Sequence, residues 1–253
     1  METWVPVLVG FALAFIATPA GVSGAFLLVP YLVSVVGIAS PSASATSLLF
    51  NTFSTPGGIY RFGRQGALNW KLSRLVIAGT VPGVIVGAVL RVNVFETPQT
   101  FKAFMGVILL LLALKMWFEI ANVVVPRKRP FSARLVMGVA VIVGVISGIY
   151  GTGGGSLMAP FLVAVMGLSV MSVRGATLTS TFITSIAGSI AFFILGTHAR
   201  WDLAVLFGIG GACGSYLGAR AKRFVSERIV KGLLAVLASL LGINYVLQGL
   251  GII

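Results

Sequence analysis

Long apolar runs fill almost the whole chain, and only short polar or charged segments separate them. No charged residue occurs over residues 5–60, 75–90, 135–173 or 175–197. A helix of about 20 apolar residues is long enough to cross the hydrocarbon layer of a bilayer. The pattern therefore predicts an all-α, polytopic membrane protein that crosses the bilayer several times.

The apolar runs form five segments on each side of a basic linker. They cover residues 4–18, 26–38, 45–60, 72–90 and 101–120, then 133–150, 156–168, 176–195, 203–219 and 229–248. The second and seventh segments are short for a full crossing, so each is expected to be a half-helix or one arm of a re-entrant hairpin. Capping side chains indicate helix starts at Thr97-Pro98, Ser132 and Ser226-Glu227.

Composition excludes several other kinds of protein. The 253 residues are 58% hydrophobic and 9% charged, with a net charge of +13. The basic residues lie between apolar spans and not on one aromatic-rich face, so nucleic-acid binding is not expected. One cysteine, one histidine and five scattered carboxylates build neither a metal site nor an acid–base pair. We therefore expect no enzymatic activity, no metal and no cofactor.

The two halves of the chain match each other at constant spacing. Gly21, Gly24, Leu27, Pro30, Leu32, Val33 and Gly37 recur as Gly151, Gly154, Leu157, Pro160, Leu162, Val163 and Gly167. After a one-residue insertion, Ala45-Thr46, Ser54, Gly57, Trp70, Gly79, Gly83 and Gly87 recur as Ala176-Thr177, Ser185, Gly188, Trp201, Gly210, Gly214 and Gly218. The matches predict a first transmembrane repeat over residues 1–125, a basic linker over 126–132 and a second repeat over 133–253.

Loop charges predict that the second repeat is inverted relative to the first. The loop before residue 75 carries Arg61, Arg64, Lys71 and Arg74, whereas its counterpart in the second half holds His198, Arg200 and Asp202. Basic loops stay on the cytoplasmic side, so equivalent loops lie on opposite sides of the membrane. The assignment places both termini outside a cytoplasmic membrane that the chain crosses several times.

Glycines repeat every four residues at 79, 83 and 87, and again at 210, 214 and 218. This spacing puts them on one helix face, where the missing side chains allow another helix to approach closely. We expect both ladders to serve helix packing and not to contact a substrate.

Two turns rich in small residues interrupt the apolar pattern at equivalent places. The second turn, residues 151–156, reads Gly-Thr-Gly-Gly-Gly-Ser, and the first turn, residues 18–24, keeps Pro19 and Ser23. A new helix is expected near Ser156, and the free N–H groups of a helix N-terminus favour an anion. The alternative interpretation is that the glycines only allow helices to cross closely.

Polar residues in the helices after each turn complete a candidate substrate site. The predicted members are Ser23, Gly24, Thr46, Ser47, Asn51, Thr152, Gly153, Gly154, Gly155, Ser156, Arg174, Thr177, Ser180 and Thr181. Asn51 is the strongest candidate because its amide must find partners within an apolar segment. Serine and threonine can instead bond their own helix carbonyls, and Arg174 either guides an anion or anchors the inner end of a helix.

Specific stretches resemble the sulfite exporter TauE/SafE family. They are residues 21–30 with Ala45-Thr-Ser47, and residues 148–160 with Arg174-Gly-Ala-Thr177. The likeness covers essentially the whole chain and implies an integral membrane transporter of sulfite, sulfonates or related sulfur anions. We therefore expect a secondary transporter that works by alternating access, with a small anion and the lipid bilayer as its partners. The alternatives are a passive anion channel and a non-transporting membrane scaffold.

Overall fold

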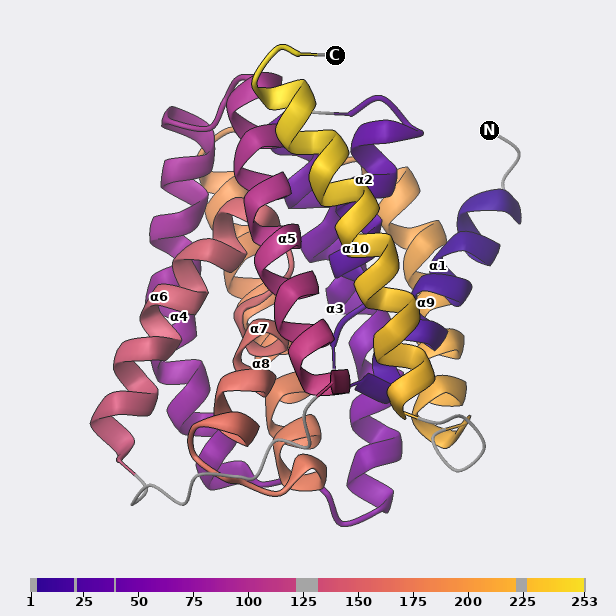
Figure 1. Ribbon diagram of the computed structural model, residues 1–253, viewed down its shortest axis with the longest axis vertical. Helices are drawn as coiled ribbons and strands as arrows, with labels where there is room; N and C mark the ends of the chain where they lie inside the picture. The colour runs from indigo at the N-terminus through magenta and orange to yellow at the C-terminus, as the bar shows by residue number, and fades with distance from the viewer. Residues whose placement is uncertain (1–3, 21, 39, 122–131, 222–226, 253) are drawn as a thin grey trace.

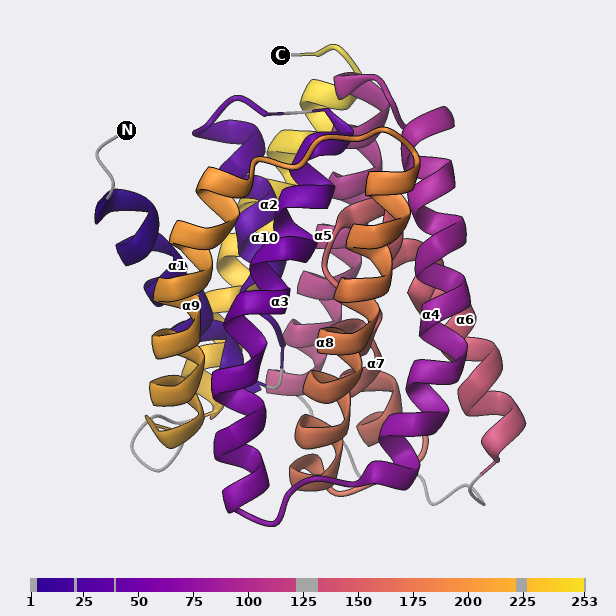
Figure 2. The same ribbon diagram turned by 180° about the vertical axis from the view of Figure 1, so that it is seen from behind.

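The computed structural model describes residues 4–20, 22–38, 40–121, 132–221 and 227–252 as a bundle of α-helices (Figures 1 and 2). The helices are α1 (Trp4–Ala17), α2 (Ala25–Ser34), α3 (Pro41–Arg64), α4 (Trp70–Asn93), α5 (Pro98–Ala121), α6 (Ala133–Tyr150), α7 (Gly154–Ala164), α8 (Val170–Ile194), α9 (Trp201–Ala221) and α10 (Glu227–Gly249), with a 3₁₀ turn, η1 (Thr18–Ala20), after α1. These residues contain no β-strand, so the all-α class is confirmed. Most of the predicted linker, residues 126–131, lies outside the described part.

Two predicted capping signals, Thr97-Pro98 and Ser132, coincide with helix starts, and the cap predicted at Ser226 lies outside the described residues. Pro98 opens α5, and the Ser132 side chain accepts a hydrogen bond from the N–H of Leu135 at the start of α6. Two further caps were not predicted: Asn69 precedes α4 and Ser169 precedes α8, and each side chain accepts a hydrogen bond from an N–H in the first turn of its helix. Both helices begin earlier than the apolar runs do. The reason is that each helix starts directly after its capping residue, which precedes the apolar run.

Six helices are long and apolar enough to cross a membrane among the described residues. They are α4, α5, α6, α8, α9 and α10. Helices α1 and α2 are apolar but shorter. Helix α3 has 24 residues, enough for a crossing, but many of them are polar, and most of its polar side chains are buried. A polar helix inside an apolar bundle marks a site or a pathway within the protein.

The glycine ladders bring α4 onto α6 and α9 onto α1. A Cβ at Gly83 would lie 2.3 Å from the carbonyl oxygen of Val141 in α6. A Cβ at Gly210 would lie 1.8 Å from that of Val7 in α1. Any side chain at these positions would therefore force the helix backbones apart, which is the packing role that the sequence predicts for the ladders.

Helices α5 and α10 lie side by side and cover α2 (Figure 1). Pro30 inside α2 has no N–H, so the carbonyl of Phe26 loses its helix partner. The Tyr150 hydroxyl of α6 donates a hydrogen bond to this carbonyl at 3.0 Å, and the Tyr245 hydroxyl of α10 donates to the carbonyl of Pro30 at 2.9 Å. These bonds tie α2 to helices of the other half of the chain.

The ends of the bundle differ in which turns they carry. Helix α1 begins and α10 ends toward one end, while the α3–α4 turn and the end of α9 lie at the other (Figures 1 and 2). Helix α2 returns toward the end from which α1 came, and α7 does the same with respect to α6. The two helical hairpins thus enter the bundle from opposite ends.

Candidate substrate site

Asn51 joins the two turns in the interior of the bundle. Its side-chain oxygen accepts a hydrogen bond from the Ser23 hydroxyl in the first turn. Its side-chain nitrogen donates to the backbone carbonyl of Thr152 in the second turn, at 2.8 Å. Asn51 is fully buried, and one amide thus satisfies groups that are far apart in the sequence.

The second turn has a backbone that only glycine adopts without strain. Gly151 ends α6 with φ +95° and Gly153 precedes α7 with φ +72°, both in the left-handed region. L-residues with a side chain rarely take such values. Helix α7 then begins at Gly154, two residues earlier than the sequence predicts, because the glycines form its first turn.

The start of α7 packs directly against α8. A Cβ at Gly155 would lie 2.0 Å from the carbonyl oxygen of Thr177. The N–H of Gly154 donates to the Thr184 hydroxyl at 3.2 Å, so the first turn of α7 already uses one side-chain acceptor from α8. A Cβ at Gly153 would lie 2.6 Å from the hydroxyl oxygen of Ser185. The positive end of the α7 dipole therefore faces a row of hydroxyl groups.

Three buried hydroxyls around the second turn have no hydrogen-bond partner in the described part of the chain. They belong to Ser47 of α3 and to Thr181 and Ser185 of α8, and all three residues are fully buried. Ser47 lies on the α3 face between Ser44 and Asn51, which contact the second turn. A buried hydroxyl without a partner costs about 1–3 kcal/mol, so these groups point to a ligand or water that they bind.

Neighbouring hydroxyls are already bonded within their own helices. Those of Thr55, Thr177, Thr179 and Thr184 donate to carbonyls three or four residues earlier, at 2.7–2.9 Å for the four-residue bonds. About half of the polar side chains thus follow the interpretation that serine and threonine serve their own helix. The hydroxyls of Ser47, Thr181 and Ser185, which make no such bond, are therefore the ones that characterise the candidate site.

The first turn relies on side chains more than on backbone shape. The Ser23 hydroxyl accepts a hydrogen bond from the N–H of Ala25 at 3.1 Å, at the start of α2, and donates to Asn51. Gly24 has an ordinary helical φ of −59°. Its missing side chain allows contact with α1, since a Cβ would lie 2.9 Å from the backbone nitrogen of Ala14.

Arg91 of α4 is fully buried, although it is a charged residue near the end of an apolar helix. Its guanidinium stacks on the Phe101 ring at 3.7 Å and donates to the Ser44 hydroxyl at 3.3 Å. Ser44 in turn donates to the carbonyl of Ile149 at 2.9 Å, just before the second turn. Arg91 therefore stabilises the position of α3 against the end of α6.

Comparison with known proteins decides the family. The family model of the sulfite exporter TauE/SafE matches residues 7–245. The chain belongs to the TauE/SafE family. TauE/SafE membership, together with the six candidate spans, makes it a multi-pass membrane transporter and favours transport over catalysis.

The curated relatives are named as membrane transporters, and the matches to them cover most of both chains. The probable membrane transporter protein YunE of Bacillus subtilis (strain 168) is 24% identical, covering 96% of this chain and 97% of the relative. YdhB of the same strain is 24% identical, covering 94% and 97%. A probable membrane transporter protein of Xylella fastidiosa (strain Temecula1 / ATCC 700964) is 26% identical, covering 83% and 80%. No solved structure matches this TauE/SafE chain.

The TauE/SafE fold brings most of the predicted site residues together. Those at or beside the two turns are Ser23, Gly24, Ser47, Asn51, Thr152, Gly153, Gly154, Gly155, Thr177, Ser180 and Thr181. Ser156 lies in the first turn of α7. Arg174 is 2% exposed and lies about two helical turns before Thr181 on α8.

Thr46 lies apart from the turns. Its hydroxyl donates to the Ser42 carbonyl and accepts a hydrogen bond from the N–H of Arg200 at 3.0 Å, in the loop before α9. It fastens that loop to α3. Three residues beside the turns, Ser44, Thr80 and Ser185, are not among the predicted site residues. The Thr80 hydroxyl lies 3.2 Å from that of Ser180, and its position directly after Gly79 in an apolar ladder helix is the signal that could have found it.

Proposed function

We propose that the protein is a secondary transporter that moves a small sulfur-containing anion, such as sulfite or a sulfonate, across the cytoplasmic membrane by alternating access. The observation that carries this proposal is the meeting of both turns at Asn51, beside buried hydroxyls that have no partner. The match to the sulfite exporter family supports the sulfur anion as substrate.

The surroundings of the second turn suit an anion with several oxygen atoms. Ser47, Thr181 and Ser185 offer hydroxyl donors, and the N-terminus of α7 adds the positive end of a helix dipole. The buried Arg174 contributes a positive charge on the same helix as two of these hydroxyls. Asn51 then acts as a positioning residue, because its hydrogen bonds hold the two turns together.

Helix pairing supports the proposal that residues 1–125 and 133–253 are inverted repeats. Helix α4 pairs with α6 as α9 pairs with α1, and α3 packs on α9 as α8 packs on α4. A Cβ at Gly58 would lie 2.6 Å from the Leu178 side chain, and one at Gly188 would lie 2.8 Å from that of Leu48. This reciprocal packing favours a constant offset of 130 residues through α3 and α8, which moves the one-residue insertion to the loop before Trp201.

The distribution of basic side chains supports an orientation with both termini outside. Of the described basic residues, Arg91, Lys102 and Arg200 lie toward one end of the bundle, whereas the helix ends on the other side, that of the α3–α4 turn and the end of α9, carry Arg61, Arg64, Lys71, Arg74, Arg134 and Arg220. This end is opposite the one where α1 begins and α10 ends (Figure 1). The positive-inside rule assigns the basic end to the cytoplasm.

Flux in proteoliposomes tests the function. The purified protein should take up labelled sulfite saturably, and unlabelled sulfite trapped inside should accelerate the uptake by counterflow. Flux without saturation or counterflow would indicate a passive channel, and absence of flux for every anion would indicate a scaffold.

A thermal-shift panel of sulfite, thiosulfate, taurine, sulfoacetate and sulfate selects the substrate, since a specific ligand at 100 times its Kd stabilises by about 2.7 kcal/mol.

A further inference from the structure

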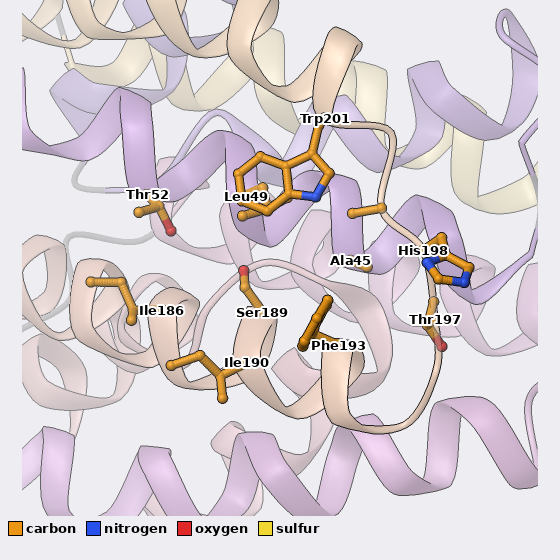
Figure 3. Close-up of a pocket in the computed structure, with 11 residues that line it drawn as sticks. Ala45, Leu49, Thr52, Ile186, Ser189, Ile190, Phe193, Thr197, His198 and Trp201 are labelled. Carbon is orange, nitrogen blue, oxygen red and sulfur yellow. The ribbon is translucent and has the colours of Figure 1, made fainter.

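A pocket of about 410 Å³ opens between α3 and α8, below the loop that leads into α9 (Figure 3). Its walls are mostly apolar and include Leu49, Ile190, Phe193 and Trp201. Phe193 is 72% exposed and Trp201 is 57% exposed, so the pocket opens at the surface of the bundle. It lies at the end of the bundle that the loop charges assign to the outside.

A line of hydroxyls leads from this pocket to the second turn. Ser189 lines the pocket, and Figure 3 shows its hydroxyl directed toward Leu49 and Trp201. Ser185 and Thr181 follow at intervals of four residues on the same face of α8. The hydroxyl oxygens of all three are buried and have no hydrogen-bond partner in the described structure. We call Thr181, Ser185 and Ser189 the hydroxyl stripe.

The equivalent place at the opposite end of the bundle is closed. With the offset of 130 residues, Ala45 in the pocket corresponds to Gly175 of α8, and the loop before α9 corresponds to the loop before α4. A Cβ at Gly175 would lie 2.3 Å from the carbonyl oxygen of Ala67, which is 4% exposed. The inner loop thus packs directly on α8 at this position, whereas the outer loop, although bonded to α3 at Thr46, leaves a pocket beside Ala45 and Leu49.

We propose that this pocket is the outer vestibule of the transport path, and that the hydroxyl stripe conducts the hydrated anion from it to the second turn. The structure is then the conformation that is open to the outside and closed to the inside. This inference rests on the proposed function. Partner-free hydroxyls at regular spacing form successive weak sites, from which a bound anion can move on.

Thiol labelling tests the vestibule without depending on transport. In a Cys213→Ser background, which removes the single cysteine, Ser189→Cys places a thiol at the outer end of the stripe. Val86→Cys is the matched control, because Val86 is 51% exposed on the surface of α4, away from the pocket. It lies at a similar depth to Ser189, since Gly188, the residue before Ser189, packs on Val84. Right-side-out vesicles are treated with a charged, membrane-impermeant methanethiosulfonate reagent in the absence of sulfite, which itself reacts with the reagent.

We expect Ser189→Cys to react at least about tenfold faster than Val86→Cys, because only a thiol in contact with water ionises to the reactive thiolate. Equal rates would overturn the proposal that the pocket is a vestibule.

A second pair of variants, Ser189→Trp and Val86→Trp, tests the path. The first should reduce sulfite flux at least about tenfold and the second should not. If Ser189→Trp transports normally, the stripe is not the path. Rapid labelling of Ser189→Cys together with absent sulfite flux in the wild-type protein would refute only the proposed function.

Discussion

The two turns at the centre of the bundle occupy equivalent places but are built differently. The second turn uses backbone shape, with left-handed glycines at 151 and 153 and a bare first turn of α7 against α8. The described residues of the first turn have no left-handed conformation, and they contribute the Ser23 hydroxyl. Backbone geometry at one turn and a side chain at the other are joined by a single residue, Asn51.

Under the proposed function, this difference corresponds to a division of roles between the two halves. In that proposal, the second half supplies most of the donors for the anion, namely the start of α7 with Thr181 and Ser185, while Ser47 of the first half adds a third hydroxyl. The first half supplies the positioning residues, Ser23 and Asn51. A duplicated site whose halves began alike can diverge in this way, since a single anion needs one set of donors and a fixed frame around it.

The largest effect is expected when alanine replaces glycine in the second turn. Gly155→Ala places a Cβ 2.0 Å from the carbonyl oxygen of Thr177, while Gly24→Ala places one 2.9 Å from a backbone nitrogen. We expect Gly155→Ala to destabilise by about 3 kcal/mol and Gly24→Ala by about 1 kcal/mol, in the range for overpacking. Melting temperatures in detergent measure both.

Gly138→Ala is the control for that comparison, because nothing lies within 4 Å of a Cβ at this position in α6. It should leave stability unchanged or raise it slightly, since alanine favours a helix by about 1 kcal/mol over glycine. A Gly24→Ala variant that is less stable than Gly155→Ala would contradict the division between a backbone-based and a side-chain-based turn.

Asn51→Asp should abolish transport with a moderate loss of stability. The aspartate keeps an oxygen for Ser23 but loses the donor to the Thr152 carbonyl and places a negative charge beside the anion. We expect a cost of about 1–3 kcal/mol for the unsatisfied carbonyl. Sulfite flux and melting temperature are measured together, and normal flux would show that the anion does not approach Asn51.

Ser23→Ala should have the smallest effect of the three. It removes one hydrogen bond to Asn51 and leaves the bond between Asn51 and Thr152 in place. A loss of about 1 kcal/mol in stability and a modest loss of flux are expected. If Ser23→Ala reduces flux as much as Asn51→Asp does, the first turn binds the anion directly and the proposed division of roles is wrong.

The sequence predicts the helices well because apolar spacing and capping residues act locally. Pro98 and Ser132 mark helix starts where the structure has them, and the glycine ladders lie at helix contacts. The polar character of α3 is also visible in the sequence. The position of this helix in the interior could not be predicted, because it depends on packing against helices from both halves of the chain.

The pairing of individual polar groups cannot be predicted from spacing alone. Thr177 and Thr181 look alike in the sequence, yet the hydroxyl of Thr177 donates to the carbonyl of Val173 while that of Thr181 has no partner among the described residues. The difference depends on rotamers and on neighbours such as Gly155. Arg91 is a similar case, because its burial depends on how α4 packs against Phe101.

The double variant Thr181→Val with Ser185→Ala tests the central claim most directly. Neither hydroxyl has a partner in the described structure, so their removal should keep or raise the melting temperature. Sulfite flux should fall at least about a hundredfold, because the variant removes two hydrogen bonds to a charged group, each worth about 1.5–3 kcal/mol. Thr179→Val, which removes a hydroxyl bonded to Gly175, is the control and should keep its flux. Wild-type flux in a stable double variant would contradict the proposed anion site.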